Sequence, residues 1–204
     1  MIDPDPARFY RLQTDSGWQR VLADFAAWTE PQPGWRSLDI GTGPGLLPGL
    51  LTARGLQACG IDCDPQVYAA GRLHDCLAVA DGLRLPFPER AFELVTASNL
   101  LFLLSDPLAA LGEMRRVLAP GGKLALLNPS EKMSVQAAAR LANQRQLDDF
   151  ARQTLLDWAQ RAEGHRRWSE TETASLLQAA GLAFDRSVLR IGPGLARLAC
   201  GHLP

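Results

Sequence analysis

The sequence of 204 residues lacks the long apolar stretches that mark membrane proteins. The apolar run at residues 100–104 is far shorter than the roughly 20 residues that a bilayer span needs. Residues 1–6 show neither the basic segment nor the apolar segment of a secretory leader. Hydrophobic residues make up 47% of the chain and charged residues 21%, which is typical of globular proteins and excludes wholesale disorder. We therefore expect one soluble domain in the cytoplasm, without a membrane partner.

Cysteine and histidine are scarce, and neither is arranged as a metal site. The 4 cysteines form no Cys-x-x-Cys pair, and the 3 histidines have no ligand spacing around them. An excess of one charge is also missing, because 21 basic residues face 22 acidic ones without a long block of either sign. The electrostatic footprint of a nucleic-acid-binding protein is therefore absent. These absences favour a small-molecule partner and predict neither a metal centre nor a disulfide framework.

The patterns that are present alternate between strands and helices. Residues 6–30 carry apolar positions at helical spacing with a break at Gly17, which predicts two helices before the first strand. The remaining patterns predict strands at 35–40, 57–61, 76–80, 92–97 and 123–127, with helices at 46–54, 65–72 and 107–118 between them. Such alternation is typical of right-handed crossovers in a doubly wound α/β sheet.

The C-terminal third of the sequence adds to this core. Helical spacing continues from residue 134 to 162, which is longer than one crossover helix needs, so we interpret it as an insertion. Residues 169–172, SETE, form a capping-box pattern for a last helix that ends at Gly181. Two strand-like segments at 184–191 and 195–200 surround a Gly-Pro-Gly turn, which predicts a closing antiparallel hairpin.

A glycine-rich turn follows the first predicted strand, at residues 39–45, DIGTGPG. Residues without a Cβ allow a ligand to approach the main chain closely, although a tight structural turn alone would use the same residues. The dinucleotide fingerprint Gly-x-Gly-x-x-Gly would need its third glycine at the position of Leu46. The spacing therefore disfavours a pyrophosphate cradle, and with it a nicotinamide oxidoreductase.

Two acidic residues end the next two predicted strands. Asp62 lies 21 residues after Gly41, where a carboxylate can accept hydrogen bonds from both ribose hydroxyls of an adenosine. Asp81 ends the third strand and can accept from an adenine amine, while the backbone of Gly82 faces the ring. Either acid alone is commonly a helix cap, but both of them after a glycine loop indicate a single nucleoside site.

Residues 37–130 carry these motifs in an order that resembles the class I S-adenosylmethionine-dependent methyltransferases, in the small-molecule branch that includes ubiquinone-type enzymes. Residues 38–45, LDIGTGPG, resemble motif I, and residues 60–62, GID, resemble the ribose motif. Residues 80–87, ADGLRLPF, resemble the adenine motif, and residues 115–123, RRVLAPGGK, match the segment before strand five.

The resemblance implies a Rossmann-like sheet of seven strands in the order 3-2-1-4-5-7-6, with the last strand antiparallel. It implies S-adenosyl-L-methionine as the cofactor and S-adenosyl-L-homocysteine as its product. The residues that we expect to bind this cofactor are Asp39, Gly41, Gly43, Gly45, Asp62, Cys63, Asp81, Gly82 and Asn99. Relatives that methylate amines of nucleic acids carry an Asn/Asp-Pro-Pro-aromatic motif after strand four, whereas this chain has SNLL at residues 98–101.

We predict that residues 1–204 form one methyltransferase domain with a helical cap. Residues 1–35 would be N-terminal cap helices, 36–133 the cofactor-binding core, 134–168 a lid, and 169–204 the last helix and hairpin. All 5 tryptophans lie outside residues 36–157, which suggests an apolar acceptor pocket roofed by aromatic side chains: Tyr10, Trp18, Phe150 and Trp158. The alternative is that these aromatic side chains only pack the cap helices against the sheet.

No general base is identifiable from the sequence. The candidates are Tyr10, Glu131, His165 and His202, and nothing in their spacing connects them to the nucleoside site. The catalytic residues, the acceptor and the oligomeric state are therefore left open. The expected function is methyl transfer to a small, partly apolar molecule, with a catalytically silent cofactor-binding protein as the alternative.

Overall fold

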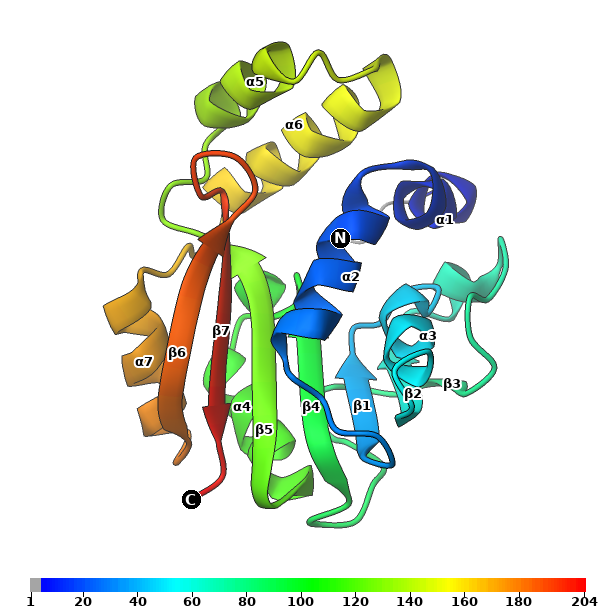
Figure 1. Ribbon diagram of the computed structural model, residues 1–204, viewed down its shortest axis with the longest axis vertical. Coiled ribbons are helices and arrows are strands. Elements are labelled where there is room, and N and C mark those ends of the chain that lie inside the picture. Colours follow the sequence, from blue (N-terminus) through cyan, green and yellow to red (C-terminus); the bar gives the residue numbers. More distant parts are fainter. Residues whose placement is uncertain (1–4) are drawn as a thin grey trace.

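The computed structural model describes residues 5–204 and contains a central seven-stranded sheet (Figure 1). The strand order is β3-β2-β1-β4-β5-β7-β6, as predicted. Strands β1 to β5 pair in parallel, and β7 runs antiparallel to both β5 and β6. The strands are β1 Arg36–Ile40, β2 Gln57–Asp62, β3 Leu77–Val79, β4 Phe92–Ser98, β5 Leu118–Pro129, β6 Ala183–Arg190 and β7 Ala196–His202. The Rossmann-like fold is therefore confirmed.

Helices cover both faces of this sheet, with α2 and α3 on one face and α4 and α7 on the other (Figure 1). Strand β5 shows the alternation that fills both layers: Leu124 and Leu126 face the α4 side, and Ala125 and Leu127 face the α2 side. The helices are α1 Pro6–Asp15, α2 Trp18–Trp28, α3 Leu46–Thr52, α4 Pro107–Val117, α5 Val135–Gln144, α6 Asp149–Glu163 and α7 Glu170–Ala179, with 3-10 turns η1 Pro65–Tyr68 and η2 Leu101–Leu103.

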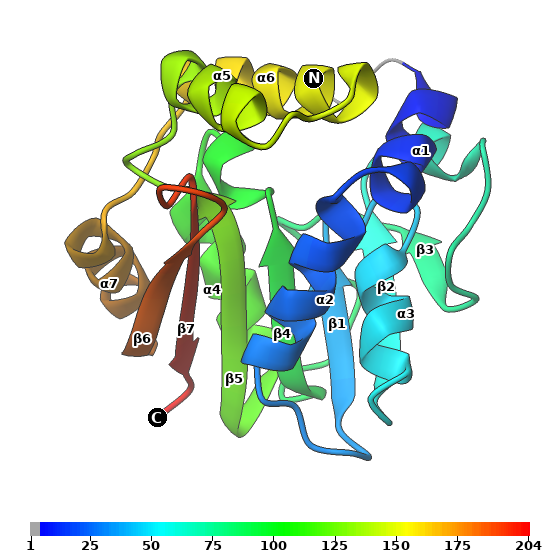
Figure 2. The same ribbon diagram turned by 45° about the horizontal axis from the view of Figure 1, so that its top comes forward.

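A third apolar cluster lies beneath α5 and α6, which cross above the carboxyl ends of the parallel strands (Figure 2). Leu141 and Leu155 come from the two helices, and Phe102 and Leu195 come from the loops below them. The predicted continuous insertion is thus two helices with a break at residues 145–148. The break has a local cause, since Gln146 adopts a positive φ of 49° and Asp148 caps the next helix by accepting from Ala151 N.

Several predicted boundaries differ from the structure, and three of them have a visible cause or consequence. Strand β5 begins at Leu118 and not at 123, because Phe92 pairs with Leu118 and Leu94 with Lys123, so that the Pro-Gly-Gly segment forms an irregularity inside the strand. The helix predicted at 65–72 is only the turn η1, and Gly71 follows it with a φ of 140°. Strand β3 spans Leu77–Val79 only. Within residues 5–204, no helix has the length and apolar character to cross a membrane.

The predicted capping box of α7 is present and fixes where this helix begins. The Ser169 hydroxyl accepts from Glu172 N at 3.3 Å, and the Glu172 carboxylate accepts from Ser169 N at 2.8 Å. We expect Ser169→Ala to lower the free energy of unfolding by about 1 kcal/mol, because the Glu172 N–H loses its acceptor and the Glu172 carboxylate loses the hydroxyl that donates to it. Urea denaturation measures this change. The control is Ser175→Ala in the exposed interior of the same helix, which should be neutral or slightly stabilising. Equal effects of the two substitutions would contradict a stabilising cap.

Candidate functional site

A cavity of about 390 Å³ lies between the carboxyl ends of the parallel strands and the helices above them. Figure 2 shows the ribbons of the strands and helices that surround it. Its floor comes from the ends of β1, β2 and β4 and from the loop after β3. Its walls and roof come from α1, α2 and α6. The cavity thus joins the predicted nucleoside site to the segments that hold most of the tryptophans.

The glycine loop between β1 and α3 turns tightly at the edge of this cavity. Gly43 and Gly45 have φ values of 56° and 96°, which L side chains rarely adopt. A Cβ at Gly43 would lie 2.6 Å from the Phe9 ring, and a Cβ at Gly45 would lie 2.6 Å from Leu77. These two glycines therefore permit the close packing of α1 and β3 on the loop.

Asp62 connects the end of β2 to the glycine loop. Its carboxylate accepts from Gly43 N at 3.0 Å and from Asp64 N at 3.1 Å, and the residue is only 7% exposed. A carboxylate has about four lone-pair positions, so two of them are left for hydroxyl groups of a ligand. Asp81 is exposed at the end of the neighbouring strand and accepts from Leu83 N at 2.9 Å. The two predicted acids therefore border the same cavity.

Asp39 is the most deeply buried acid at this edge of the sheet. It is 2% exposed, and its carboxylate accepts from the Thr96 hydroxyl at 2.7 Å. Burial raises the pKa of Asp39 to about 7, an effect that the hydrogen bond from Thr96 opposes and the charge of Asp62 adds to. The carboxyl group is thus poised to change protonation near neutral pH.

Seven of the nine predicted cofactor residues border the cavity, and two do not. Those that border it are Asp39, Gly41, Asp62, Cys63, Asp81, Gly82 and Asn99. Gly43 and Gly45 are not among its lining residues, since Phe9 and Leu77 pack against their backbone. Contact between any of these residues and the cofactor stays a prediction.

Two of the four aromatic residues that were predicted to roof the acceptor pocket line the cavity, and two do not. Trp18 and Trp158 border the cavity and contact each other edge to face, with ring centroids 5.5 Å apart. Tyr10 and Phe150 are not lining residues: Tyr10 packs near Gly71, and the Phe150 ring lies under the Arg11 guanidinium. Phe9 and Phe102 line the cavity instead, and the sequence reasoning missed both. The helical spacing of residues 9 and 12 predicts that they share one apolar face of α1, but it does not predict which part of the fold this face packs against.

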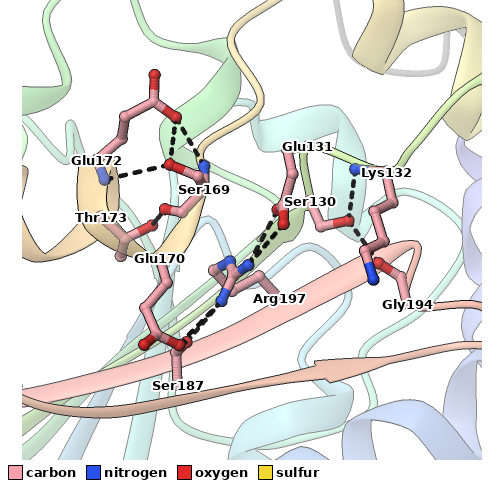
Figure 3. Close-up of polar contacts among 10 residues, drawn as sticks. All are labelled: Ser130, Glu131, Lys132, Ser169, Glu170, Glu172, Thr173, Ser187, Gly194 and Arg197. Carbon is pink, nitrogen blue, oxygen red and sulfur yellow. Dashed lines mark hydrogen bonds and ion pairs between the residues drawn. The ribbon is translucent and has the colours of Figure 1, made fainter.

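None of the four candidate bases is a lining residue of the cavity. The Glu131 carboxylate faces Arg197, whose Nη2 donates to both carboxylate oxygens at 2.9 and 3.0 Å (Figure 3). His202 hydrogen-bonds to Asp185, and the His165 ring contacts Phe102. Glu131, His165 and His202 therefore have structural partners, as Tyr10 does.

Comparison with known proteins agrees with this architecture. A family model described as a methyltransferase domain matches residues 38–126. A demethylmenaquinone methyltransferase of Corynebacterium kroppenstedtii is 31% identical over 160 residues, which cover 74% of this chain and 69% of that protein. The chain belongs to the class I S-adenosylmethionine-dependent methyltransferases. The cofactor of this family is S-adenosylmethionine.

Two further relatives define how far the similarity of this methyltransferase extends. An uncharacterized methyltransferase of Mycobacterium sp. (strain KMS) is 37% identical over 128 residues, which cover 61% of this chain but only 50% of that protein. The chain thus matches about half the length of that relative. A Haloferax volcanii chain solved in complex with the methyltransferase activator Trm112 has a TM-score of 0.71 at 20% identity, covering 98% of this chain and 94% of that chain. This likeness supports the fold.

The residues of this methyltransferase fit the cofactor of its family. Three carboxylates border the cavity at the strand ends, and they suit a ligand that carries a diol, an ammonium group and a sulfonium. Above the glycine loop, Gln13 is 5% exposed, and its buried Oε1 has no hydrogen-bond partner within residues 5–204. An unpaired buried acceptor is costly, so a donor group of a ligand would satisfy Gln13.

The raised pKa of Asp39 has a consequence for stability. A carboxyl whose pKa is higher in the folded protein than in the unfolded chain stabilises the fold while it is protonated, and this contribution is lost as the pH rises through about 7. We therefore expect the unfolding free energy of Asp39→Asn, relative to the parent, to rise by about 1 kcal/mol or more between pH 5 and pH 8. Urea denaturation across this range measures the difference. Exposed Asp24 supplies the control, Asp24→Asn. Parallel pH profiles for Asp39→Asn and the parent would refute the burial effect.

Proposed function

We propose that this methyltransferase transfers a methyl group from S-adenosylmethionine to a small, partly apolar molecule. The observation that carries the proposal is the continuity of the cavity. It extends from the strand-end acids Asp62 and Asp81 to the apolar residues of the lid, such as Leu147 and Trp158. A nucleoside-containing cofactor and an apolar acceptor would thus share one enclosed space.

The chemistry of the reaction suits this arrangement. When bound, the cofactor supplies a methyl group on a sulfonium, which an acceptor attacks in line, so no nucleophile of the protein is needed. The residues of the chain then have two tasks: Asp62 and Asp81 hold the nucleoside, and the apolar side chains of α1, α2 and α6 orient the acceptor and exclude water.

The names of some relatives give this proposal a direction. Several of them are demethylmenaquinone methyltransferases, from organisms that include Corynebacterium kroppenstedtii and Thermus thermophilus. Those names describe an apolar acceptor, and the cavity of this chain is lined mainly by apolar side chains. The predicted cytoplasmic location and the absence of a nucleic-acid partner stay predictions.

Asp62 offers the direct test of cofactor binding. We expect Asp62→Asn to weaken the binding of S-adenosylhomocysteine by about 10-fold or more, because the hydroxyl groups of the ligand lose a charged acceptor. Isothermal titration calorimetry measures the dissociation constant. The matched control is Asp75→Asn, an exposed acid outside the cavity, which should bind like the parent. Unchanged affinity in Asp62→Asn would reduce this acid to a structural partner of the glycine loop.

Turnover needs a separate experiment, since binding alone would also be seen in a catalytically silent protein. The purified protein is incubated with a metabolite extract and S-adenosylmethionine labelled in its methyl group. We expect label in an organic-soluble product, and about 10-fold less label with Asp62→Asn at the same low cofactor concentration, in proportion to its weaker binding. Tight binding without label in any fraction would favour the silent alternative.

A further inference from the structure

One face of α6 forms a stripe along the cavity. Thr154, Trp158 and Arg161 follow at helical spacing, and all three are lining residues. Trp158 lies in the middle of the stripe, and Arg161 follows it by one turn and carries a charge. The lining of the cavity is mainly apolar, with Asp157 and Arg145 among the other charged residues near this end of it. Phe102 and Leu155 line the same cavity and belong to the apolar cluster beneath the helix.

Trp158 fixes the orientation of Asn99 in the floor opposite. Its indole Nε1 lies 3.1 Å from Asn99 Oδ1. An indole N–H only donates, so the facing atom of the amide must be its oxygen. The amide nitrogen of Asn99 is therefore turned away from Trp158, and it has no hydrogen-bond partner within residues 5–204. Because Asn99 borders the cavity, this nitrogen is available as a donor to a ligand.

Arg161 is a half-buried cation without a counter-ion in the part of the chain that the structure describes. The nearest acid along the helix, Asp157, pairs with Arg8 on α1 and accepts from Gln153 at 2.7 Å. The other acids of the cavity, Asp39, Asp62 and Asp81, accept hydrogen bonds at the sheet edge, from the Thr96 hydroxyl and from backbone N–H groups. Three of the four cavity acids thus lie on the cofactor side, and the fourth, Asp157, is occupied by Arg8. Arg161 and the exposed Arg145 are the further charges on the acceptor side, and both are positive.

A partly desolvated guanidinium in apolar surroundings is stabilised when an anion meets it. We propose that the acceptor of this enzyme is an apolar molecule with an anionic oxygen, such as a carboxylate or a phenolate, which pairs with Arg161 and accepts a hydrogen bond from the Asn99 amide. This inference rests on the proposed function, and it narrows the acceptor from partly apolar molecules to apolar acids. Arg161 is then a specificity-determining residue for charge.

Two fluorescent probes of similar shape test the inference without knowledge of the natural acceptor. The first is 1-anilinonaphthalene-8-sulfonate, which is apolar and anionic, and the second is N-phenyl-1-naphthylamine, its neutral analogue. Both are titrated into the intact protein saturated with S-adenosylhomocysteine. We expect Arg161→Gln to weaken binding of the anionic probe by about 10-fold, because a charge-assisted hydrogen bond is lost, and to leave the neutral probe within about twofold.

Matched variants complete the design. Arg161→Lys keeps the charge and should recover part of the affinity for the anionic probe, whereas Arg166→Gln removes an exposed arginine outside the cavity and should change neither probe. Equal losses for both probes, or no loss for either, in a folded Arg161→Gln would overturn the inference. Calorimetry with S-adenosylhomocysteine separates the two proposals. If the parent protein does not bind S-adenosylhomocysteine, the proposed function is wrong. If the parent binds it but Arg161→Gln affects both probes equally or neither, only the inference about Arg161 is wrong.

Discussion

The hydrogen bond from the Gly43 amide to the Asp62 carboxylate joins the two segments on which the whole site depends. Parallel strands end at one edge of a sheet, where backbone bonds from Gly41 N and Thr42 N to Ile61 O lead the loop after β1 toward β2, and the Gly43–Asp62 bond adds to them. The bond holds the glycine loop after β1 against the end of β2, in a register already set by the pairing of Ile40 with Ile61. The cavity residues of the glycine loop and of the end of β2, such as Gly41 and Asp62, are thereby held next to each other.

The upper half of the cavity depends on contacts between segments far apart in the sequence. Arg8 on α1 pairs with Asp157 on α6, and Trp18 contacts Trp158 beside them. The two helices are separated in the sequence by strands β1 to β5, yet they meet above the carboxyl edge of the sheet (Figure 2). Since Trp158 also donates to Asn99, the position of α6 is coupled to the loop after β4. A displacement of α6 would therefore change both the roof and the floor of the site.

The sequence predicted the lower half of this site far better than the upper half, and the reason is physical. A tight turn that a ligand can approach needs glycine, and a strand-end carboxylate needs Asp or Glu, so Gly41, Asp62 and Asp81 leave a local signature at fixed spacing. The strand order came from the resemblance to a family, because pairing between distant strands has no local signature. The N-terminal helices have no such signature either: Phe9 and Tyr10 are neighbours with similar side chains, and only the packing of α1 decides that Phe9 borders the cavity and Tyr10 does not.

The acceptor has the weakest signature in the sequence, and the chemistry of methyl transfer explains why. A methyl group on a sulfonium is already activated, so the reaction needs no nucleophile of the protein, and it needs a base only where the acceptor has to lose a proton. The residues that determine acceptor specificity therefore contribute the shape and the charge of the acceptor site. Many different side chains can do this, so these residues form no recognisable sequence motif. In this chain Asp39, Asp62 and Asp81 border the cavity at the sheet edge, whereas Asp157 on α6 is paired with Arg8. Arg161, on the same helix as Asp157, has no counter-ion among residues 5–204. An acceptor with its own negative charge would complete that arrangement, since it would neutralise the lid cation at the place where the apolar roof excludes water.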